Sequence, residues 1–181
     1  MANIKAILDV LVESKNKEKV ELPPVDEWKS FKYSELFDIT RGKGGTITAA
    51  KNNPGKNPFV TSSSENNGVS FYTSLEPTEK ANTITVANNG SVGEAFYHKN
   101  AYLATSDASI LDLKDYTLTP AIAIFLITLI RKEQFKFNYG RKWGISRMKD
   151  SIIKLPVTSK GKPDYDLIER YINSLPYSKY I

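Results

Sequence analysis

The sequence of 181 residues predicts an α+β fold, because two kinds of pattern follow one another along the chain. Between residues 42 and 115, short runs of β-branched and aromatic residues alternate with clusters of Gly, Asn and Ser, as in strands and turns. After Thr119 the apolar residues recur with helical spacing. We therefore expect a short-stranded, twisted β-sheet domain that carries a buried helix and a C-terminal helix.

Residues 1–26 are predicted to form an N-terminal helix and a linker, and residues 27–181 to form the domain. The apolar residues that would share one face of the N-terminal helix are Ile4, Ile7, Leu8 and Leu11. A charged stretch with Pro23-Pro24 follows and is typical of a linker. The domain opens on aromatic residues, among which Ser34 is expected to cap a short helical turn.

Strands are predicted where β-branched and aromatic residues gather, at residues 57–61, 82–87, 93–97 and 109–113. The segment Asn88-Asn89-Gly90 lies between two of these runs. Asn-Gly flanked by strand-like residues is a strong local signal for a β-hairpin. We therefore expect the second and third strands to pair.

The later part of the chain is predicted to be mainly helical. Thr119 is expected to cap a helix that Pro120 opens and that continues to about Glu133. Because this helix is apolar almost all round, it is expected to be central to the core. A turn over residues 147–150 capped by Ser146, a strand over 152–157 and a helix over 164–175 complete the prediction.

Positive charge is concentrated in two stretches. Residues 41–60 contain four basic side chains and no acidic one, and residues 131–149 contain seven basic side chains against Glu133. The whole chain has a formal net charge of +5, so the remainder is net negative. Two basic stretches on an otherwise acidic chain favour a surface that binds a polyanion, although two solvated basic loops explain the charge alone equally well.

The residues that catalysis requires are scarce. The chain has no cysteine and a single histidine, His98, which is expected to be an ordinary turn residue. Gly42-Lys43-Gly44-Gly45-Thr46 lacks the spacing of a P-loop. Pro163-Asp164 is better explained as a helix cap than as a nuclease motif. We therefore expect a binding protein without catalytic residues, metal or cofactor.

The chain also lacks signals for membrane insertion or export. Its longest apolar run, Pro120–Ile130, is far shorter than the roughly 20 residues that cross a bilayer. Residues 1–20 contain no apolar segment followed by a small-residue cleavage site. A soluble, cytoplasmic protein is expected.

Several segments together resemble the target-recognition domains of specificity subunits from type I restriction–modification systems and their type IIB and IIG relatives. The resemblance covers roughly Glu27 to the C-terminus. It rests on segments 37–43, 57–69, 83–97, 139–157 and 163–178, which occur in the order that is typical of the family. Full specificity subunits have two such domains separated by long paired helices, whereas one domain and no long heptad pattern are evident here.

The resemblance implies a prokaryotic, non-catalytic component that recognises double-stranded DNA by sequence. A partner methyltransferase subunit, using S-adenosylmethionine, would modify adenine, and a restriction subunit could join the complex. The partner would contact the N-terminal helix or the apolar stripe of residues 164–175. Dimerisation through the terminal helices stays open.

The candidate DNA-binding residues come from the basic stretches and the polar turns. Lysines suit phosphate contacts, arginines can contact either phosphate or guanine, and asparagines can pair with adenine. The set is Arg41, Lys43, Thr46, Lys51, Ser63, Asn66, Asn67, Asn89, Arg141, Lys142 and Arg147. For Asn66, Asn67 and Asn89 a purely structural role in turns is favoured. Trp143 and Tyr139 are expected to pack, half-buried, rather than to stack on bases.

Two other classes remain open. An interaction protein or decoy would bind methyltransferase subunits without recognising DNA. A carbohydrate- or other ligand-binding module would use the Asn, Ser and Tyr residues of its loops to hold hydroxyl groups. Only phosphate binding weakens steeply with salt, so salt dependence separates DNA recognition from the latter class.

Overall fold

The computed structural model describes residues 19–137, 140–176 and 178–181, and within them it confirms the α+β class. Its sheets have the strand orders β1–β9, β2–β8–β5–β6 and β4–β3–β7. The strands are β1 (Lys29–Lys32), β2 (Phe37–Arg41), β3 (Pro54–Val60), β4 (Val69–Thr73), β5 (Thr83–Ala87), β6 (Ala95–His98), β7 (Leu103–Ala104), β8 (Ala108–Leu113) and β9 (Ile152–Leu155). The α-helices are α2 (Tyr33–Leu36), α3 (Ile47–Lys51), α4 (Pro120–Arg131), α5 (Ile145–Asp150) and α6 (Tyr165–Ser174), and short 3-10 turns are η1 (Val25–Glu27), η2 (Asn66–Gly68), η3 (Gln134–Lys136) and η4 (Ser178–Tyr180).

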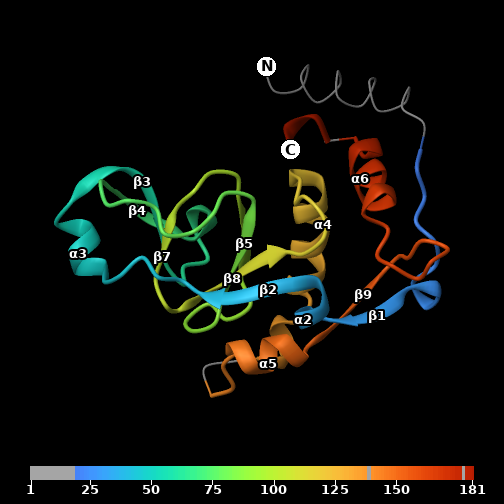
Figure 1. The fold of residues 1–181 in the computed structure, drawn as a ribbon, viewed down its shortest axis with the longest axis horizontal. Helices are drawn as coiled ribbons and strands as arrows, with labels where there is room; N and C mark the ends of the chain where they lie inside the picture. Colours follow the sequence, from blue (N-terminus) through green and yellow to red (C-terminus); the bar gives the residue numbers. More distant parts are fainter. Residues whose placement is uncertain (1–18, 138–139, 177) are drawn as a thin grey trace, which may run out of the picture.

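The buried helix predicted from the sequence is α4. Thr119 Oγ1 accepts a hydrogen bond from the Ile122 amide at 3.4 Å, and Pro120 occupies the first turn. The helix ends at Arg131, before the predicted end at Glu133. Its side chains Ile122, Leu126 and Ile130 are fully buried. Figure 1 shows α4 between the four-stranded sheet and α6, so one helix joins the sheet to the C-terminal part of the fold.

The strand prediction is confirmed for β5, whose residues are all buried, and for the strands on either side of it. The predicted hairpin also forms, because β5 and β6 pair with Val86 opposite Ala95. Its connection spans residues 88–94 and is longer than the two-residue turn that Asn-Gly favours. The reason is that Asn88 is buried and donates through Nδ2 to Ser106 O and to Ser109 Oγ, each at 3.3 Å.

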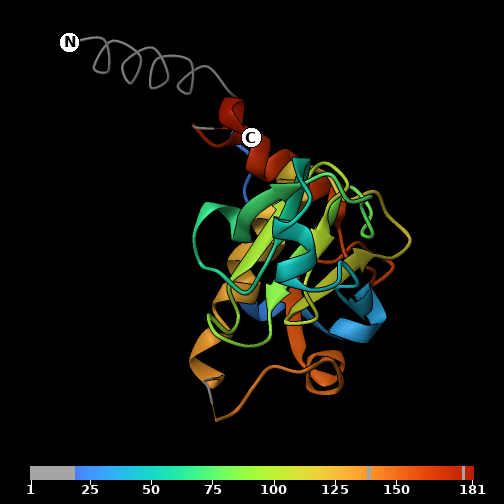
Figure 2. The same cartoon turned by 90° about the vertical axis from the view of Figure 1, so that its left-hand side faces the viewer.

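A lobe built from α3, β3, β4 and β7 projects from the four-stranded sheet (Figures 1 and 2). Its core is a cluster of Ala50, Phe59 and Leu103, and the Phe59 ring stacks on the Phe71 ring at 4.8 Å. The sequence did not predict α3, because Ala50 is its only buried residue and no apolar stripe marks it. The strands β1, β2, β4 and the two-residue β7 were not predicted either.

Both serines expected to cap short helices lie inside them, and these predictions are wrong. Ser34 is within α2, whose first turn is closed by Glu35 accepting from the Lys32 amide. Ser146 is within α5, whose N-cap is Gly144. This helix begins earlier because the fully buried Trp143 fixes the chain just before it, and the Met148 amide donates to Gly144 O at 2.9 Å.

The β1–β9 ladder joins the beginning of the predicted domain to the strand that precedes α6, with Lys29 opposite Leu155. Leu22, from the predicted linker, packs against the main core, so core contacts begin before residue 27. The predicted N-terminal helix over residues 1–14 lies outside the described residues. Within the described part of the chain, no helix is long and apolar enough to cross a membrane.

The C-terminal helix α6 is capped as predicted. Asp164 Oδ1 accepts from the Leu167 amide at 2.9 Å. Ile168 and Ile172 from the predicted stripe are buried in the main core, whereas Leu175 is exposed. The stripe therefore packs mostly on the domain itself.

His98 is not a turn residue, contrary to the sequence-based expectation. It is the last residue of β6 and is buried, because the strand continues through it to pair with Thr83. His98 Nε2 lies 2.9 Å from Thr85 Oγ1, and the imidazole stacks on the Tyr102 ring at 4.2 Å. Burial lowers the pKa of His98 from its ordinary value to about 4.

Truncating Ile122 is expected to lower the free energy of unfolding by about 2–5 kcal/mol, because a cavity would open in the main core. Ile124 lies on the same helix and is 40% exposed. Ile124→Ala is therefore a matched control, with an expected loss of about 1 kcal/mol or less. Urea unfolding of both variants measures the difference, and equal losses would contradict the buried position of Ile122.

His98 is also expected to make stability depend on pH. Its folded-state pKa is depressed, so between about pH 6.5 and pH 4 the unfolded chain binds a proton that the folded chain does not. Stability should therefore fall as the pH is lowered through this window, by about 2 kcal/mol between pH 7 and pH 5. Urea unfolding at both pH values tests this. His98→Gln should remove that part of the loss, whereas an unchanged loss would assign it to other groups.

Candidate nucleic-acid interface

Several loops leave the same end of the four-stranded sheet. Since β8 is antiparallel to β2 and to β5, its first residues lie beside the last residues of both, with Arg41 opposite Ser109 and Ala87 opposite Ala108. A further loop joins them because Ser62 Oγ donates to Asp107 O at 2.8 Å. We call the surface formed by residues 41–45, 61–68, 88–94 and 105–107 the loop edge.

The first of these loops is fixed by its own backbone. The Gly42 amide donates to Ala108 O at 3.0 Å, and the Gly44 amide donates to Ala104 O at 2.8 Å. Between them, the Lys43 amide donates to the carboxylate of Glu79 at 2.7 Å. These amides are therefore bound within the fold, and side chains are left to make the contacts with a ligand.

Asp107 connects the remaining loops. Its carbonyl oxygen accepts from Ser62 Oγ and from the Asn88 amide, the latter at 2.9 Å. Asn89 Nδ2 lies 3.5 Å from Asp107 Oδ1, while Asn89 Oδ1 is buried and has no hydrogen-bond partner within the described residues. Backbone and side-chain contacts thus hold the polar loops in one arrangement.

The structure brings six of the predicted residues to the loop edge: Arg41, Lys43, Ser63, Asn66, Asn67 and Asn89. Of these, Arg41, Lys43, Asn66 and Asn67 are exposed. The two adjacent asparagines adopt φ values of 48° and 54°, the left-handed conformation that asparagine tolerates in turns. They therefore shape the turn and still present side chains to solvent.

Thr46, the N-cap of α3, and Lys51, the last residue of α3, belong to the projecting lobe. Thr46 Oγ1 caps the helix by accepting from the Ala49 amide at 3.1 Å. The Lys51 ammonium lies 5.8 Å from the centre of the Phe71 ring. Both side chains thus have structural contacts in addition to the ligand contact proposed for them.

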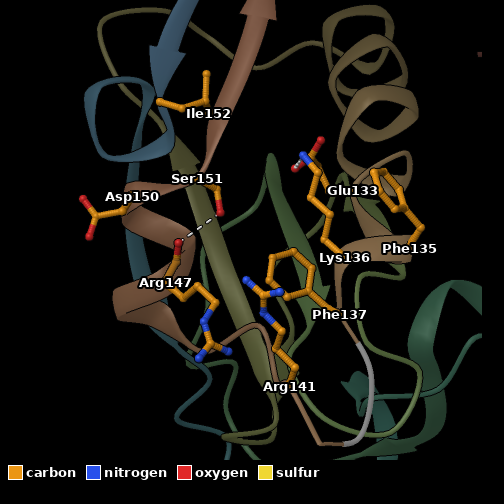
Figure 3. Close-up of a pocket in the computed structure, with 9 residues that line it drawn as sticks. All are labelled: Glu133, Phe135, Lys136, Phe137, Arg141, Arg147, Asp150, Ser151 and Ile152. Carbon is orange, nitrogen blue, oxygen red and sulfur yellow. Dashed lines mark hydrogen bonds and ion pairs between the residues drawn. The ribbon is translucent and has the colours of Figure 1, made fainter.

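The second basic stretch forms an open hollow of about 740 Å³ between η3 and α5 (Figure 3). Its residues are Glu133, Phe135, Lys136, Phe137, Arg141, Arg147, Asp150, Ser151 and Ile152. The wall behind it is rigid, because the Phe137 ring stacks on buried Trp143 at 4.6 Å and Trp143 packs edge-on against Tyr33. Trp143 is a packing residue, as predicted, and Tyr139 lies outside the described residues.

Among the predicted residues, Arg141 and Arg147 line this hollow and Lys142 lies between them along the chain. All three are exposed. Arg147 is oriented by a hydrogen bond from its guanidinium to Lys142 O. The predicted DNA-binding residues of the first part of the chain therefore lie at or next to the loop edge, whereas those of the second basic stretch lie at the hollow.

The residues that connect the loop edge to the hollow were not predicted from the sequence. Arg131, at the end of α4, donates to Ala95 O at 3.0 Å and pairs with Glu94 at 3.3 Å. Gln134 Nε2 donates to the same carboxylate at 2.9 Å. The basic charge of Arg131 was visible in the sequence, but nothing there showed that it points back to the loop edge.

No group of three or more histidine, aspartate or glutamate side chains within the described residues is placed to hold a metal ion. The arrangement supplies exposed cations, amides and hydroxyls around polar loops. Such groups suit binding to phosphates and base edges.

A family model described as the type I restriction modification DNA specificity domain matches residues 25–178. The chain belongs to this family. Membership confirms the resemblance seen in the sequence and the prediction of a specificity component rather than a catalytic subunit.

Individual relatives agree with this specificity-domain family. The chain is 36% identical over 146 residues to the specificity subunit S.BcgI of a type II restriction enzyme from Heyndrickxia coagulans, covering 80% of this chain and 42% of that protein. A putative type I specificity subunit from Mycoplasma pneumoniae is 28% identical over 120 residues, covering 66% of this chain and 32% of that protein. The chain thus spans less than half the length of these relatives.

Solved structures show the same fold. An S subunit of a type I restriction–modification system from M. genitalium has a TM-score of 0.63 at 14% identity, covering 85% of this chain and 39% of that one. The HsdS subunit from Thermoanaerobacter tengcongensis has a TM-score of 0.57 at 15% identity, covering 94% and 44%. The short-stranded α+β architecture is therefore that of specificity domains.

Gly42→Ala is expected to distort the loop edge of this specificity domain. A Cβ at residue 42 would lie 2.4 Å from Thr105 O and 2.6 Å from Ala104 O, so backbone must move. We expect a loss of about 1–3 kcal/mol in stability, with faster hydrogen exchange at the Lys43 and Gly44 amides. Gly144→Ala is the control, because nothing lies within 4 Å of its added Cβ. Unchanged exchange in Gly42→Ala would show that the loop tolerates the methyl group.

Proposed function

We propose that this chain recognises a segment of double-stranded DNA by sequence, as a specificity component of a restriction–modification system. The observation that carries the proposal is the loop edge, where strand pairing gathers the exposed side chains of Arg41, Lys43, Asn66 and Asn67 on rigid loops. Rigid presentation favours direct contacts to bases, because little conformational entropy is lost on binding.

The two basic regions would divide the work of recognition. Exposed lysines and arginines neutralise phosphates and thereby set affinity and register, whereas arginine and asparagine side chains in a groove select bases. Arg41, Asn66 and Asn67 on the loop edge are assigned to base contacts. The cations of the hollow, with Lys43, are assigned to the DNA backbone.

The chemistry would belong to a partner. We propose that a methyltransferase subunit, which binds S-adenosylmethionine itself, modifies adenine in the DNA that this chain selects. The chain would bind DNA in assembly with that subunit and with other components of the system, in the cytoplasm of a prokaryotic cell. The family supports assembly of this kind, and the length of the relatives supports a recognition role for part of a target.

Removing the charge of Lys43 is expected to weaken DNA binding. Binding of the chain to a mixed-sequence DNA duplex is measured across a salt series, with and without a methyltransferase subunit of a restriction–modification system. Lys43→Ala should reduce the slope of log affinity against log salt by about 1, as expected when one phosphate contact is lost. Lys99→Ala is the matched control, because Lys99 follows β6 at the opposite end of the sheet from the loop edge.

The alternatives give different results in the same experiment. Binding to the methyltransferase subunit without any binding to DNA would support the decoy. Ligand binding that does not change with salt would favour the carbohydrate-type module. Equal effects of Lys43→Ala and Lys99→Ala would contradict the assignment of the loop edge.

A further inference from the structure

The hollow between η3 and α5 combines two chemical characters. Phe135, Phe137 and Ile152 supply apolar surface, and Lys136, Arg141 and Arg147 supply positive charge (Figure 3). Phe135 is 82% exposed and Ile152 is 47% exposed. An exposed apolar surface with charged residues at its edge is typical of a binding site.

Phe135 is the least expected side chain in this region. η3 positions it, because the Lys136 and Phe137 amides donate to Glu133 O and Gln134 O at 3.0 and 2.9 Å. Gln134, the preceding residue, is held to Glu94 of the loop edge. The exposed ring is therefore attached to a turn that its own backbone hydrogen bonds and a contact with the loop edge hold in place.

We propose that the hollow receives one nucleotide of the bound DNA, with the ring of Phe135 against a base face and the cations around it against phosphates. This inference rests on the proposed function and adds a non-ionic contact to it. Aromatic rings bind any base through its π face, and apolar side chains inserted at a base step partly unstack it. Such a contact contributes affinity without neutralising a phosphate.

Charge is what favours DNA over a protein as the occupant. The exposed side chains of Arg141 and Arg147 line the hollow, and the Lys136 ammonium lies 5.5 Å from the centre of the Phe135 ring. The two acids of the hollow already have cationic partners: Glu133 pairs with Lys136 at 2.6 Å, and Asp150 pairs with Lys32 at 3.0 Å. The electrostatic surroundings of Phe135 therefore suit a polyanion that also carries aromatic faces, which is the chemistry of a nucleic acid.

Phe135→Ala in the full 181-residue chain tests the proposal by the same DNA titration across salt. We expect affinity to fall at least about fivefold at every salt concentration, because a base contact is lost. The slope of log affinity against log salt should stay that of the wild-type chain, since no phosphate contact changes. Phe135→Trp should retain the affinity, and Phe135→Leu, which keeps apolar surface but lacks the ring, should not.

Tyr180→Ala is the matched control. Tyr180 is another exposed ring, 67% accessible, and it lies on η4 near the C-terminus, at the opposite end of the molecule from α5 (Figures 1 and 2). Because both side chains are exposed, neither variant should change the thermal unfolding midpoint appreciably. The control should bind DNA as the wild-type chain does.

The outcomes separate this inference from the function on which it rests. No salt-dependent DNA binding by the wild-type chain would overturn both. Wild-type binding that Phe135→Ala leaves unchanged would overturn the nucleotide contact alone. If that variant instead lost binding to the methyltransferase subunit, the ring would belong to a protein interface, and the proposal would be wrong.

Discussion

The antiparallel pairing of β8 with both β2 and β5 decides where the candidate DNA-contacting side chains lie. Ser109 is opposite Arg41 on one side and opposite Val86 on the other. A shift of one residue in the pairing of β2 with β8 would exchange the faces of β2 and expose Phe37 and Ile39, which are buried in the core. The register is therefore specified by core burial, and the loops that leave these strands are placed by the same constraint. Binding residues on variable loops can differ among specificity domains while the sheet beneath them stays the same.

The core helix α4 extends this constraint to the second basic region. Its buried face holds the helix in the main core, and its last residue, Arg131, reaches back to Glu94 and Ala95. The guanidinium also lies 5.0 Å from the centre of the Phe96 ring. An ion pair at the surface adds little stability by itself. The pair of Arg131 with Glu94 matters more for its position, because it holds the end of α4 against the loop edge. The pair thereby orients η3, and with it the hollow, relative to the loop edge.

The sequence predicted those elements whose signals are local. Thr119-Pro120 and Asp164 marked helix starts, and the continuous run of β5 marked a buried strand. Elements without a local signal were missed: α3 has one buried residue, and β7 is a short strand that exists because it pairs with β3. His98 was misassigned for a related reason. Its place in β6 depends on pairing with Thr83, at the end of the hairpin opposite the turn that Asn-Gly marks.

For the candidate site, too, the sequence indicated the residue types but not their arrangement in space. The basic residues and the polar turns were evident in the sequence, but their separation into a loop edge and a hollow was not. That separation depends on contacts between distant residues, such as Glu79 with the Lys43 amide and Gln134 with Glu94. Glu79 also shows how an acidic residue can support a loop of the candidate site. Its carboxylate is buried and accepts from a backbone amide and from Thr78 Oγ1, so its role there is to hold the loop that carries the cation.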